Sequence, residues 1–296
     1  MYTKDESHKT VLRDEIVEAL VTLPGQCYLD VTFGSGGHTK ALLEHDKSCR
    51  VIALDWDQRA LETFGNPLKE HYGERLTLVW GNFGLLYKYL KKGEADVQGI
   101  VADFGTSQMQ LKEADGFSFY HDTPLDMRMS SAYYKITAAE VVNTFPTSHL
   151  EQLFFTLGEE RHTKKLVEAL VARRRLKPFK TTRDLAELVE KTLSLGYYHV
   201  HPATKIFQAL RMFVNRELDN MNSFLSYTHQ ILSPKGRLAC ITFHSLEART
   251  VKLFMQDEQK KGTMKLVTSK AMKPTDSECF RNRSSRSAQL RIAEKI

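Results

Sequence analysis

Short apolar runs alternate with longer amphipathic segments over the first third of the chain. Four apolar runs predict buried strands at 27–31, 50–54, 76–80 and 99–103. The segments between them are about 15–20 residues long, which is enough for a helix in each connection. Strand and helix in this alternation are typical of a parallel, doubly wound sheet with right-handed crossovers. The sequence therefore predicts the α/β fold class.

This rhythm stops near residue 112 and returns after residue 213. We expect no strand within 112–213, because helical spacing of the apolar positions recurs there instead. The predicted helices lie at 138–142, 150–157, 163–175 and 182–192. Strand-like runs reappear at 236–243 and 288–293. We therefore predict a discontinuous sheet domain formed by 1–111 and 214–296, with 112–213 as a helical insertion.

Composition excludes several classes of protein. Of the 296 residues 42% are hydrophobic, which is enough for a core. No apolar run approaches the roughly 20 residues of a membrane-spanning helix, so no membrane partner is expected. The first residues carry acids and no apolar stretch, which is not typical of a secretory signal. The four cysteines form no C-x-x-C pair, so we expect reduced thiols and no metal site.

Charge is distributed unevenly along the chain. Residues 1–150 hold 15 Lys and Arg against 21 Asp and Glu, whereas 151–296 hold 27 against 15. A basic half favours a polyanionic partner, although solvated helix faces would give the same excess. The basic residues gather in two clusters, which we predict to bind phosphate: Arg161, Lys164, Lys165, Arg173, Arg174, Arg175 and Lys177, then Arg281, Arg283, Arg286 and Arg291.

A glycine-rich turn follows the first predicted strand. Gly34, Gly36 and Gly37 stand between that strand and a predicted helix, and such glycines allow unusual dihedral angles and a close approach of a ligand. Thr39 occupies the third glycine position of a dinucleotide fingerprint, which argues against a nicotinamide dehydrogenase. Asp55 ends the second predicted strand, where a carboxylate can accept hydrogen bonds from the ribose of an adenosine.

Two further acids narrow the choice of nucleoside ligand. Asp30 and Asp103 lie at the ends of predicted parallel strands, and ligands of such sheets bind at the carboxyl ends of the strands. Negative charge there suits a cation better than a pyrophosphate. S-adenosylmethionine carries a sulfonium cation and no phosphate, so we predict it as the cofactor.

Eight motifs then follow one another in order. They are His8–Leu12 (HKTVL), Asp30–His38 (DVTFGSGGH), Pro124–Met129 (PLDMRM), Gly158–Arg161 (GEER), Phe207–Arg211 (FQALR), Val214–Leu218 (VNREL), Phe243–Glu247 (FHSLE) and Arg286–Arg291 (RSAQLR). Together they closely resemble the ribosomal RNA small subunit methyltransferase H family, also called MraW. The resemblance runs from about residue 8 to residue 294, nearly the whole chain.

This resemblance implies both an activity and a site. The family methylates N4 of a cytidine in small-subunit ribosomal RNA, and its fold is a Rossmann-like class I methyltransferase domain interrupted by a helical domain. Carried over by motif, the cofactor-binding residues are Gly36, Gly37, His38, Asp55, Phe83, Asp103 and Gln110. Asp103 is also the catalytic candidate, because an acceptor on the N4 hydrogens would localise the nitrogen lone pair. Backbone carbonyls of Phe104 and Gly105 could serve instead, and a role of Asp103 in cofactor binding alone remains the alternative.

Several positions depart from the family pattern. The family's Asp-Leu-Gly-Val-Ser-Ser is here 103–108 (DFGTSQ), and Asp115, Lys235 and Ala248 replace a usual Arg, Gly and acid. A non-catalytic RNA-binding or ribosome-assembly factor is therefore the alternative function. The turn and 109–111 (MQL) look more like the mitochondrial branch, which predicts the mitochondrial matrix, with the bacterial cytoplasm as the alternative. The expected partner is small-subunit ribosomal RNA or the assembling subunit, and the oligomeric state is left open, with a homodimer as one alternative.

Three further groups have two interpretations each. His244 with Glu247 could line the substrate side or cap a helix. Asp126 and Arg128 could form an ion pair that fixes the insertion against the core, or they could contact RNA. The aromatic residues Phe117, Phe119 and Tyr120 could stack on a base drawn out of the RNA, although core packing is expected for at least two of them.

Overall fold

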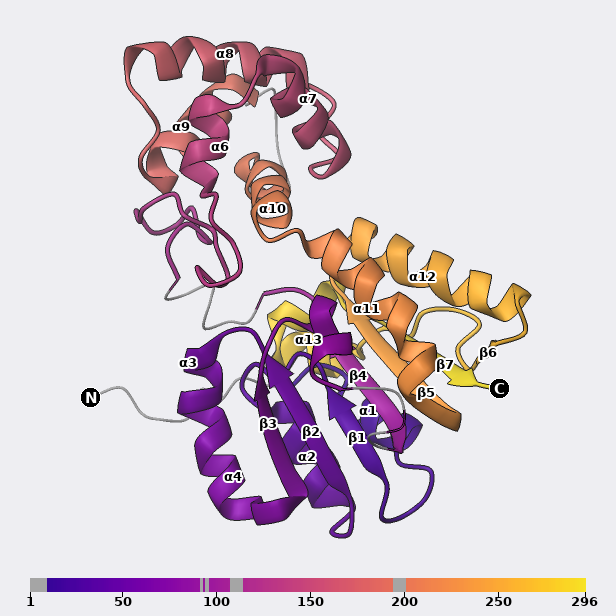
Figure 1. The fold of residues 1–296 in the computed structure, drawn as a ribbon. Coiled ribbons are helices and arrows are strands. Elements are labelled where there is room, and N and C mark those ends of the chain that lie inside the picture. The colour runs from indigo at the N-terminus through magenta and orange to yellow at the C-terminus, as the bar shows by residue number, and fades with distance from the viewer. Residues whose placement is uncertain (1–9, 91–92, 94–95, 107–113, 194–200) are drawn as a thin grey trace. The chain divides into compact units, whose positions relative to one another are not determined.

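The computed structural model describes residues 10–90, 93, 96–106, 114–193 and 201–296. The chain divides into two compact units (Figure 1). The first, here called the sheet unit, comprises Met1–Gly105 and Leu218–Ile296. The second, here called the insertion, comprises Thr106–Glu217. Each unit has its own hydrophobic core, so each is described by itself.

The sheet unit is built on a seven-stranded sheet in the order β3-β2-β1-β4-β5-β7-β6. Its strands are β1 (Cys27–Asp30), β2 (Arg50–Asp55), β3 (Leu76–Trp80), β4 (Val97–Asp103), β5 (Leu232–Thr242), β6 (Met264–Leu266) and β7 (Gln289–Lys295). The first five are parallel, whereas β7 runs antiparallel between β5 and β6. The predicted α/β sheet with parallel strands is confirmed, and the short strand β6 is the one that the apolar pattern did not predict.

Helices and helical turns connect these strands. They are α1 (Arg13–Leu20), α2 (Gly37–His45), α3 (Gln58–Ala60), the π-helix η1 (Leu61–Gly65), α4 (Asn66–Tyr72), α11 (Glu217–Ile231), α12 (Ser245–Lys260) and α13 (Asp276–Arg281), with the 3-10 helices η2 (Gly73–Arg75), η3 (Phe83–Lys88) and η4 (Arg283–Ser287). The core between α1, α2 and the sheet contains Ile16, Tyr28 and Leu42, all fully buried. Strands covered on both faces read as continuous apolar runs, which is why the sequence revealed them.

The connection from β3 to β4 differs from the prediction. A helix-length segment was expected, but over the described residues the connection forms only the 3-10 helix η3. Asn82 caps η3 by accepting a hydrogen bond from the Gly84 amide at 2.8 Å. A side chain at Gly84 would meet Asn220 of α11 at 2.5 Å, so the turn lies against that helix. This close approach leaves a tight turn in place of a longer helix.

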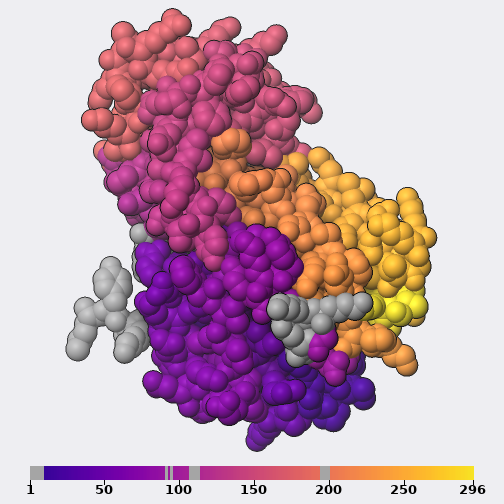
Figure 2. All heavy atoms as spheres, viewed as in Figure 1, coloured from indigo at the N-terminus to yellow at the C-terminus, as the bar shows by residue number. Residues whose placement is uncertain are grey.

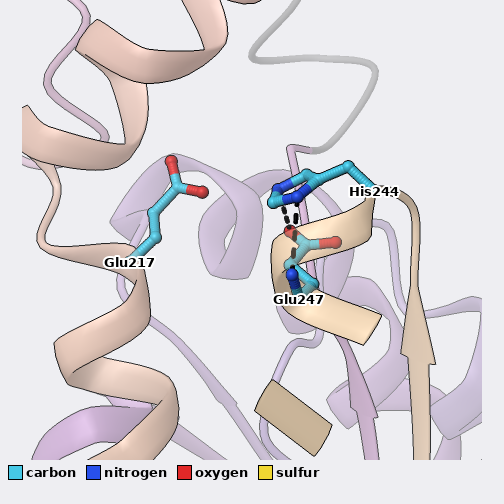
Figure 3. Close-up of side chains that lie close together, drawn as sticks. All are labelled: Glu217, His244 and Glu247. Carbon is cyan, nitrogen blue, oxygen red and sulfur yellow. Dashed lines mark hydrogen bonds and ion pairs between the residues drawn. The ribbon is translucent and has the colours of Figure 1, made fainter. Parts of the chain in front are cut away.

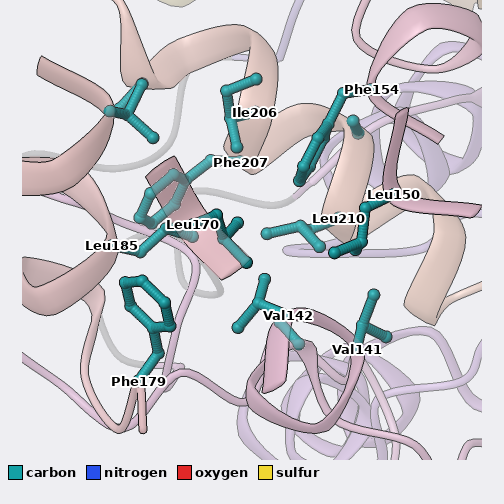
Figure 4. Close-up of a cluster of buried hydrophobic side chains, with 14 of the residues drawn as sticks. Val141, Val142, Leu150, Phe154, Leu170, Phe179, Leu185, Ile206, Phe207 and Leu210 are labelled. Atoms are coloured by element: carbon teal, nitrogen blue, oxygen red, sulfur yellow. The ribbon is translucent and has the colours of Figure 1, made fainter. Parts of the chain in front are cut away.

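The insertion consists of helices around an apolar centre (Figure 4). They are α6 (Ala138–Thr144), α7 (Thr147–Thr156), α8 (Thr163–Leu176), α9 (Thr182–Leu193) and α10 (Ala203–Val214). Helix α10 packs on α6, α7 and α9, while α8 packs on α7 and α9. All four predicted helices form. Pairing between strands is limited, among the described residues of the insertion, to the bridge between Pro124 and Thr181.

Two of the family motifs hold each other inside the insertion. Met127 is fully buried with φ of 64°, a backbone conformation that costs a non-glycine residue free energy. Asn215 fixes it by donating to the Met127 carbonyl and accepting from the Met129 amide, both at 2.7 Å. Asp126 and Arg128 on either side form a bidentate ion pair with both N–O distances at 2.7 Å. The predicted ion pair between these two residues therefore forms, whereas its expected role in fixing the insertion against the core stays a prediction.

Two general expectations can also be compared with the structure. None of the helices in the described ranges combines the length and apolarity that crossing a membrane requires. All four cysteines are free thiols, and Cys27, Cys49 and Cys240 are buried. These free thiols agree with the absence of a disulfide, while the expected reducing compartment stays a prediction.

Candidate active site

Three carboxylates end neighbouring parallel strands. Asp55 is the last residue of β2, Asp30 of β1 and Asp103 of β4. Strand β1 pairs with β2 on one side and with β4 on the other, so all three acids lie at one edge of the sheet. We call this the cofactor edge, because the carboxyl ends of a doubly wound sheet are where such folds bind nucleosides.

The glycine turn at this edge is packed against the protein itself. Gly34 and Gly36 have φ of 54° and 79°, and Gly36 precedes the first residue of α2. A Cβ atom at Gly36 would meet Phe33 and Leu68 at 2.7 Å, and one at Gly37 would meet Thr10 Oγ1 at 1.8 Å. The Cβ side of both glycines therefore faces side chains. The positive φ angles of Gly34 and Gly36 confirm the expected unusual dihedral angles, and close packing of the turn also excludes a side chain at Gly36 and Gly37. The expected close approach of a ligand stays a prediction.

Asp30 shapes the turn from beneath. It is fully buried, and its carboxylate accepts hydrogen bonds from Thr39 Oγ1 at 2.7 Å and from the Thr32 amide at 3.1 Å. Burial raises its pKa, although the His38 side chain and these two bonds act in the opposite direction. The sequence places this charge in the ligand crevice, whereas the structure uses it inside the fold. Thr39 at the third glycine position is explained in the same way, because its hydroxyl binds Asp30.

His38 and Asp103 are the polar groups left for a ligand. Thr32 Oγ1 accepts from the Asp103 amide at 2.7 Å, which fixes the end of β4. His38 Nε2 lies 3.6 Å from Asp103 Oδ2, and His38 is only 4% exposed. Among the described residues no hydrogen-bond partner is found for either His38 nitrogen or for Asp103 Oδ1. Buried polar atoms normally have partners, so these three atoms fit a polar ligand group.

Asp55 combines a structural and a ligand-binding geometry. Its Oδ2 accepts from the Gly34 amide at 2.7 Å and its Oδ1 from the Asp57 amide at 2.8 Å. Each carboxylate oxygen keeps a second lone pair, which is what two ribose hydroxyls would need. Burial raises the pKa of Asp55 to about 7, against the lowering effect of the two backbone hydrogen bonds.

Phe83 belongs to an aromatic cluster beside the acids. Its ring centroid lies 5.4 Å from that of Trp56, 5.8 Å from Phe104 and 5.9 Å from Phe224. Trp56 was not predicted as a site residue, and Phe104 was predicted only through its backbone carbonyl, although each stands one position after a predicted strand-end acid. That position was the available signal, because the residue after a strand end borders the same crevice. The predicted Gln110 lies outside the described residues.

His244 and Glu247 form the start of α12. His244 Nδ1 accepts from the Glu247 amide at 3.5 Å, and Glu247 Oε2 accepts from the Phe243 amide at 2.8 Å. Nε2 of the same imidazole lies 3.0 Å from Glu247 Oε1 (Figure 3). The helix-cap interpretation is confirmed. Glu217, also drawn there, pairs with Arg211 at 2.8 Å within the insertion, and the expected absence of a metal stays a prediction.

The basic cluster of the insertion contains two kinds of arginine. Arg173 pairs with Asp184 at 3.1 Å and lies over the Phe179 ring, and Arg174 donates to the carbonyls of Val142 and Phe145. These two are committed to internal contacts, which corrects their assignment to phosphate. The remaining members of the cluster are exposed: Arg161, Lys164, Lys165, Arg175 and Lys177. Figure 2 shows α8 at the surface of the insertion.

The three candidate stacking residues also differ in their exposure to solvent. Phe117 is buried, and Phe119 packs on Phe207 and stacks on His201 with ring centroids 4.6 Å apart. Tyr120 is 78% exposed. Core packing is therefore confirmed for two of the three, and Tyr120 alone keeps the geometry of a stacking platform.

Comparison with known proteins decides the family. The model of the MraW methylase family matches residues 5–296. The chain belongs to this family. Ribosomal RNA small subunit methyltransferase H of Magnetococcus marinus is 41% identical, covering 98% of each chain. The enzymes of the same name from Rickettsia conorii and Carboxydothermus hydrogenoformans are 38% and 39% identical, again over 98% of this chain and 99% and 98% of theirs. These relatives are bacterial, so they do not support the mitochondrial branch.

One departure from the MraW pattern has a visible structural cost. Lys235 stands where the family usually has glycine, and its φ is 63°. Glycine adopts this left-handed conformation without a steric penalty, whereas a residue with a Cβ does not. Lys235 is exposed and lies away from the cofactor edge, since it falls between Leu232 and Arg237 of β5, which pair with Val97 and Gly99 at the start of β4. The departure concerns the stability of a turn and not the site.

Proposed function

We propose that this chain is an S-adenosylmethionine-dependent methyltransferase that methylates N4 of a specific cytidine in small-subunit ribosomal RNA. The observation that carries the proposal is the cofactor edge in a chain of the MraW family. There His38 and Asp103 present buried polar atoms that find no partner among the described residues. The names of the bacterial relatives supply the substrate class, and the family resemblance supplies the nitrogen that is methylated.

The residues at the cofactor edge fit this methyl donor. Asp55 offers two acceptor lone pairs to the ribose hydroxyls, and Phe83 with Trp56 offers an apolar surface to the adenine. His38 and Asp103 offer polar atoms to the amino acid tail or to the charged sulfur. When bound, the donor supplies a methyl group already activated by the positive charge on sulfur. The protein therefore has to align the two reactants and exclude water, and activation of a leaving group is not needed.

Asp103 is the group best placed to act on the acceptor nitrogen. The N4 lone pair of cytosine is delocalised into the ring, so a hydrogen-bond acceptor on the amino hydrogens would concentrate electron density on nitrogen as the new bond forms. Asp103 Oδ1 has this capacity, and Thr32 holds the Asp103 backbone in place. The carbonyls of Phe104 and Gly105 follow it directly and offer the same chemistry. A role for Asp103 in donor binding alone is the competing assignment.

The insertion is proposed to hold the RNA. A base inside folded RNA must leave its stack to reach the donor, which costs a few kcal/mol, and contacts to the flanking phosphates must supply that free energy. Lys164, Lys165 and Arg175 are exposed on α8 and lie within one helix, so they can follow a backbone of regularly spaced phosphates.

The decisive experiment measures methyl transfer. Purified protein is incubated with S-adenosylmethionine labelled in its methyl group and with small-subunit RNA, either as free RNA or in the assembled subunit. The label should appear as N4-methylcytidine at one position. Tight RNA binding without transfer to either form would instead favour the non-catalytic assembly factor. Transfer to a different atom or to large-subunit RNA would contradict the proposed substrate.

A further inference from the structure

We propose that Phe280, Arg281, Arg283 and Arg286 form a docking surface for an unpaired segment of the RNA substrate. The proposal rests on the proposed function and adds a second RNA contact to it, on the sheet unit itself. Phe280 would stack on a base, and the three arginines would bind the neighbouring phosphates. This group is called the Phe280 surface below.

The aromatic ring of Phe280 is unusually accessible. It is 88% exposed on α13, whereas the other phenylalanines of this unit are largely within the core. An isolated exposed apolar residue needs no explanation, but here Arg281 follows directly and Arg283 two residues later, both exposed. An aromatic face next to guanidinium groups is the pattern that single-stranded nucleic acid binds, through stacking and phosphate contacts.

The backbone that carries the arginines is a turn held by internal hydrogen bonds. Asn282 and Ser285 are buried, and Ser285 Oγ donates to the Asn282 carbonyl at 2.8 Å. The Asn282 amide donates to the Glu278 carbonyl at 2.7 Å, which ties the turn to α13. Asn282 and Ser285, three residues apart, face inward in this 3-10 turn, whereas Arg281, Arg283 and Arg286 are exposed. Within the described ranges none of the three has a carboxylate partner. Arg281 donates to the Ser277 carbonyl at 3.2 Å and to its hydroxyl at 3.0 Å, so its remaining N–H groups, together with Arg283 and Arg286, are available to an anion.

The topology brings this turn to the cofactor edge. Strand β7 is antiparallel, and its first residue Gln289 pairs with Thr242, the last residue of β5. The segment that enters β7 therefore lies at the edge where the parallel strands end, with β5 between it and β4, whose last residue Asp103 pairs with Ile241 of β5. A second contact agrees with this placement, because Glu278 Oε1 of α13 accepts from the Leu12 amide at 2.9 Å, and Thr10 packs on Gly37. Figure 1 shows α13 near the ends of the parallel strands.

The chemistry favours RNA over other anionic partners. An acidic protein segment would use the arginines but would leave the Phe280 ring in water. A base stacked on Phe280 covers that ring, while the phosphates on either side reach the arginines within one or two nucleotides. A contact at this edge would hold the strand close to the atom to be methylated, which a contact on the insertion alone does not ensure.

Two variants separate stacking from charge. Phe280→Ala should weaken binding of an unpaired oligoribonucleotide that contains the target cytidine by about 5- to 100-fold, with the salt dependence unchanged. The double variant Arg283→Gln/Arg286→Gln should reduce the slope of log affinity against log salt by about 1.4, because each contact to a single strand contributes about 0.7. Phe280→Trp should retain affinity, since it keeps an aromatic face.

Matched controls come from α12. Leu253 is an exposed apolar residue and Lys252 an exposed cation, and Leu253→Ala and Lys252→Gln should change neither affinity nor slope. Donor affinity, measured by calorimetry without RNA, should be the same in all variants. Unchanged RNA affinity of Phe280→Ala would overturn the proposal, as would equal competition by inorganic polyphosphate and by the oligoribonucleotide. Failure of the wild-type protein to methylate RNA would instead contradict the proposed function. The RNA-binding measurements would still test whether the Phe280 surface binds RNA.

Discussion

The sheet unit and the insertion place their charges in opposite ways. At the cofactor edge of the sheet unit, Asp30 and Asp55 are buried and held by backbone and hydroxyl donors. In the insertion the core cluster is apolar and the basic residues of α8 lie largely at the surface, although Glu160 and Glu217 are buried. Buried carboxylates with fixed partners provide a pocket whose geometry hardly changes, whereas exposed lysines and arginines provide affinity for a polyanion of variable shape. The contrast predicts that variants of the buried acids at the cofactor edge change catalysis and donor binding, and variants of the exposed cations of the insertion change RNA binding.

The largest expected effect is at Asp103. Asp103→Asn keeps the shape of the side chain but weakens the acceptor, and it should lower kcat by roughly 100- to 1000-fold. The measurement is single-turnover methyl transfer at saturating donor and RNA, together with calorimetry of the donor. If Asp103 only binds the donor, kcat at saturation survives and the donor Kd rises. Lys164→Gln on α8 is the matched control, and we expect it to raise the KM for RNA without changing kcat.

The second prediction concerns the packing of the glycine turn. Gly37→Ala places a Cβ 1.8 Å from Thr10 Oγ1, so the turn or the N-terminal segment has to move. Overpacking of this kind costs about 1–3 kcal/mol, and donor affinity should fall by roughly tenfold or more. Thr10→Ala in the same chain removes the overlapping hydroxyl and should restore much of the affinity. A Gly37→Ala protein with wild-type donor affinity would show that the turn tolerates displacement.

The strand-end acids illustrate what sequence alone can predict. Asp30, Asp55 and Asp103 follow continuous apolar runs, and the carboxyl ends of parallel strands must share one edge, so their neighbourhood is a consequence of topology. The separate roles of the three acids cannot be predicted from topology. Whether an acid faces the fold or the ligand depends on which side chain lies beneath it, and for Asp30 that is Thr39 from the next helix.

Elements that depend on distant contacts were the least predictable. Strand β6 has three residues and exists through its pairing with β7, which no local pattern reports. Arg173 and Arg174 look like their neighbour Arg175 in sequence, and only the helix rotation decides that two of them meet Asp184 and the end of α6. Charge along a chain therefore identifies a basic helix but does not say which of its residues are available to RNA.

The third prediction uses the titration of Asp55. Its pKa is raised to about 7, so below that pH the carboxyl is protonated and loses acceptor capacity. Donor affinity should fall by about tenfold per pH unit below 7 and stay constant above it. The stability has the opposite sign, because a raised pKa in the folded state favours folding at low pH and that contribution is lost as pH rises from about 4 to 7. Calorimetry and denaturant titrations over this range would show both trends, and Asp55→Asn should remove both.

The smallest expected effects concern two adjacent arginines, Arg174 and Arg175, which should affect stability and RNA binding respectively. Arg174 donates to the Val142 and Phe145 carbonyls at 2.8 and 2.9 Å, where it satisfies the last carbonyls of α6. Arg174→Met should therefore lower the free energy of unfolding by about 1–3 kcal/mol, because it leaves those carbonyls without this donor. Arg175→Met should leave unfolding within about 0.5 kcal/mol of wild type and weaken RNA binding by a few-fold. The opposite result, with Arg175→Met destabilising the fold and Arg174→Met weakening RNA binding, would contradict the assignment of internal and exposed arginines on α8. It would also contradict the inference that the insertion uses different cations for its own stability and for RNA binding.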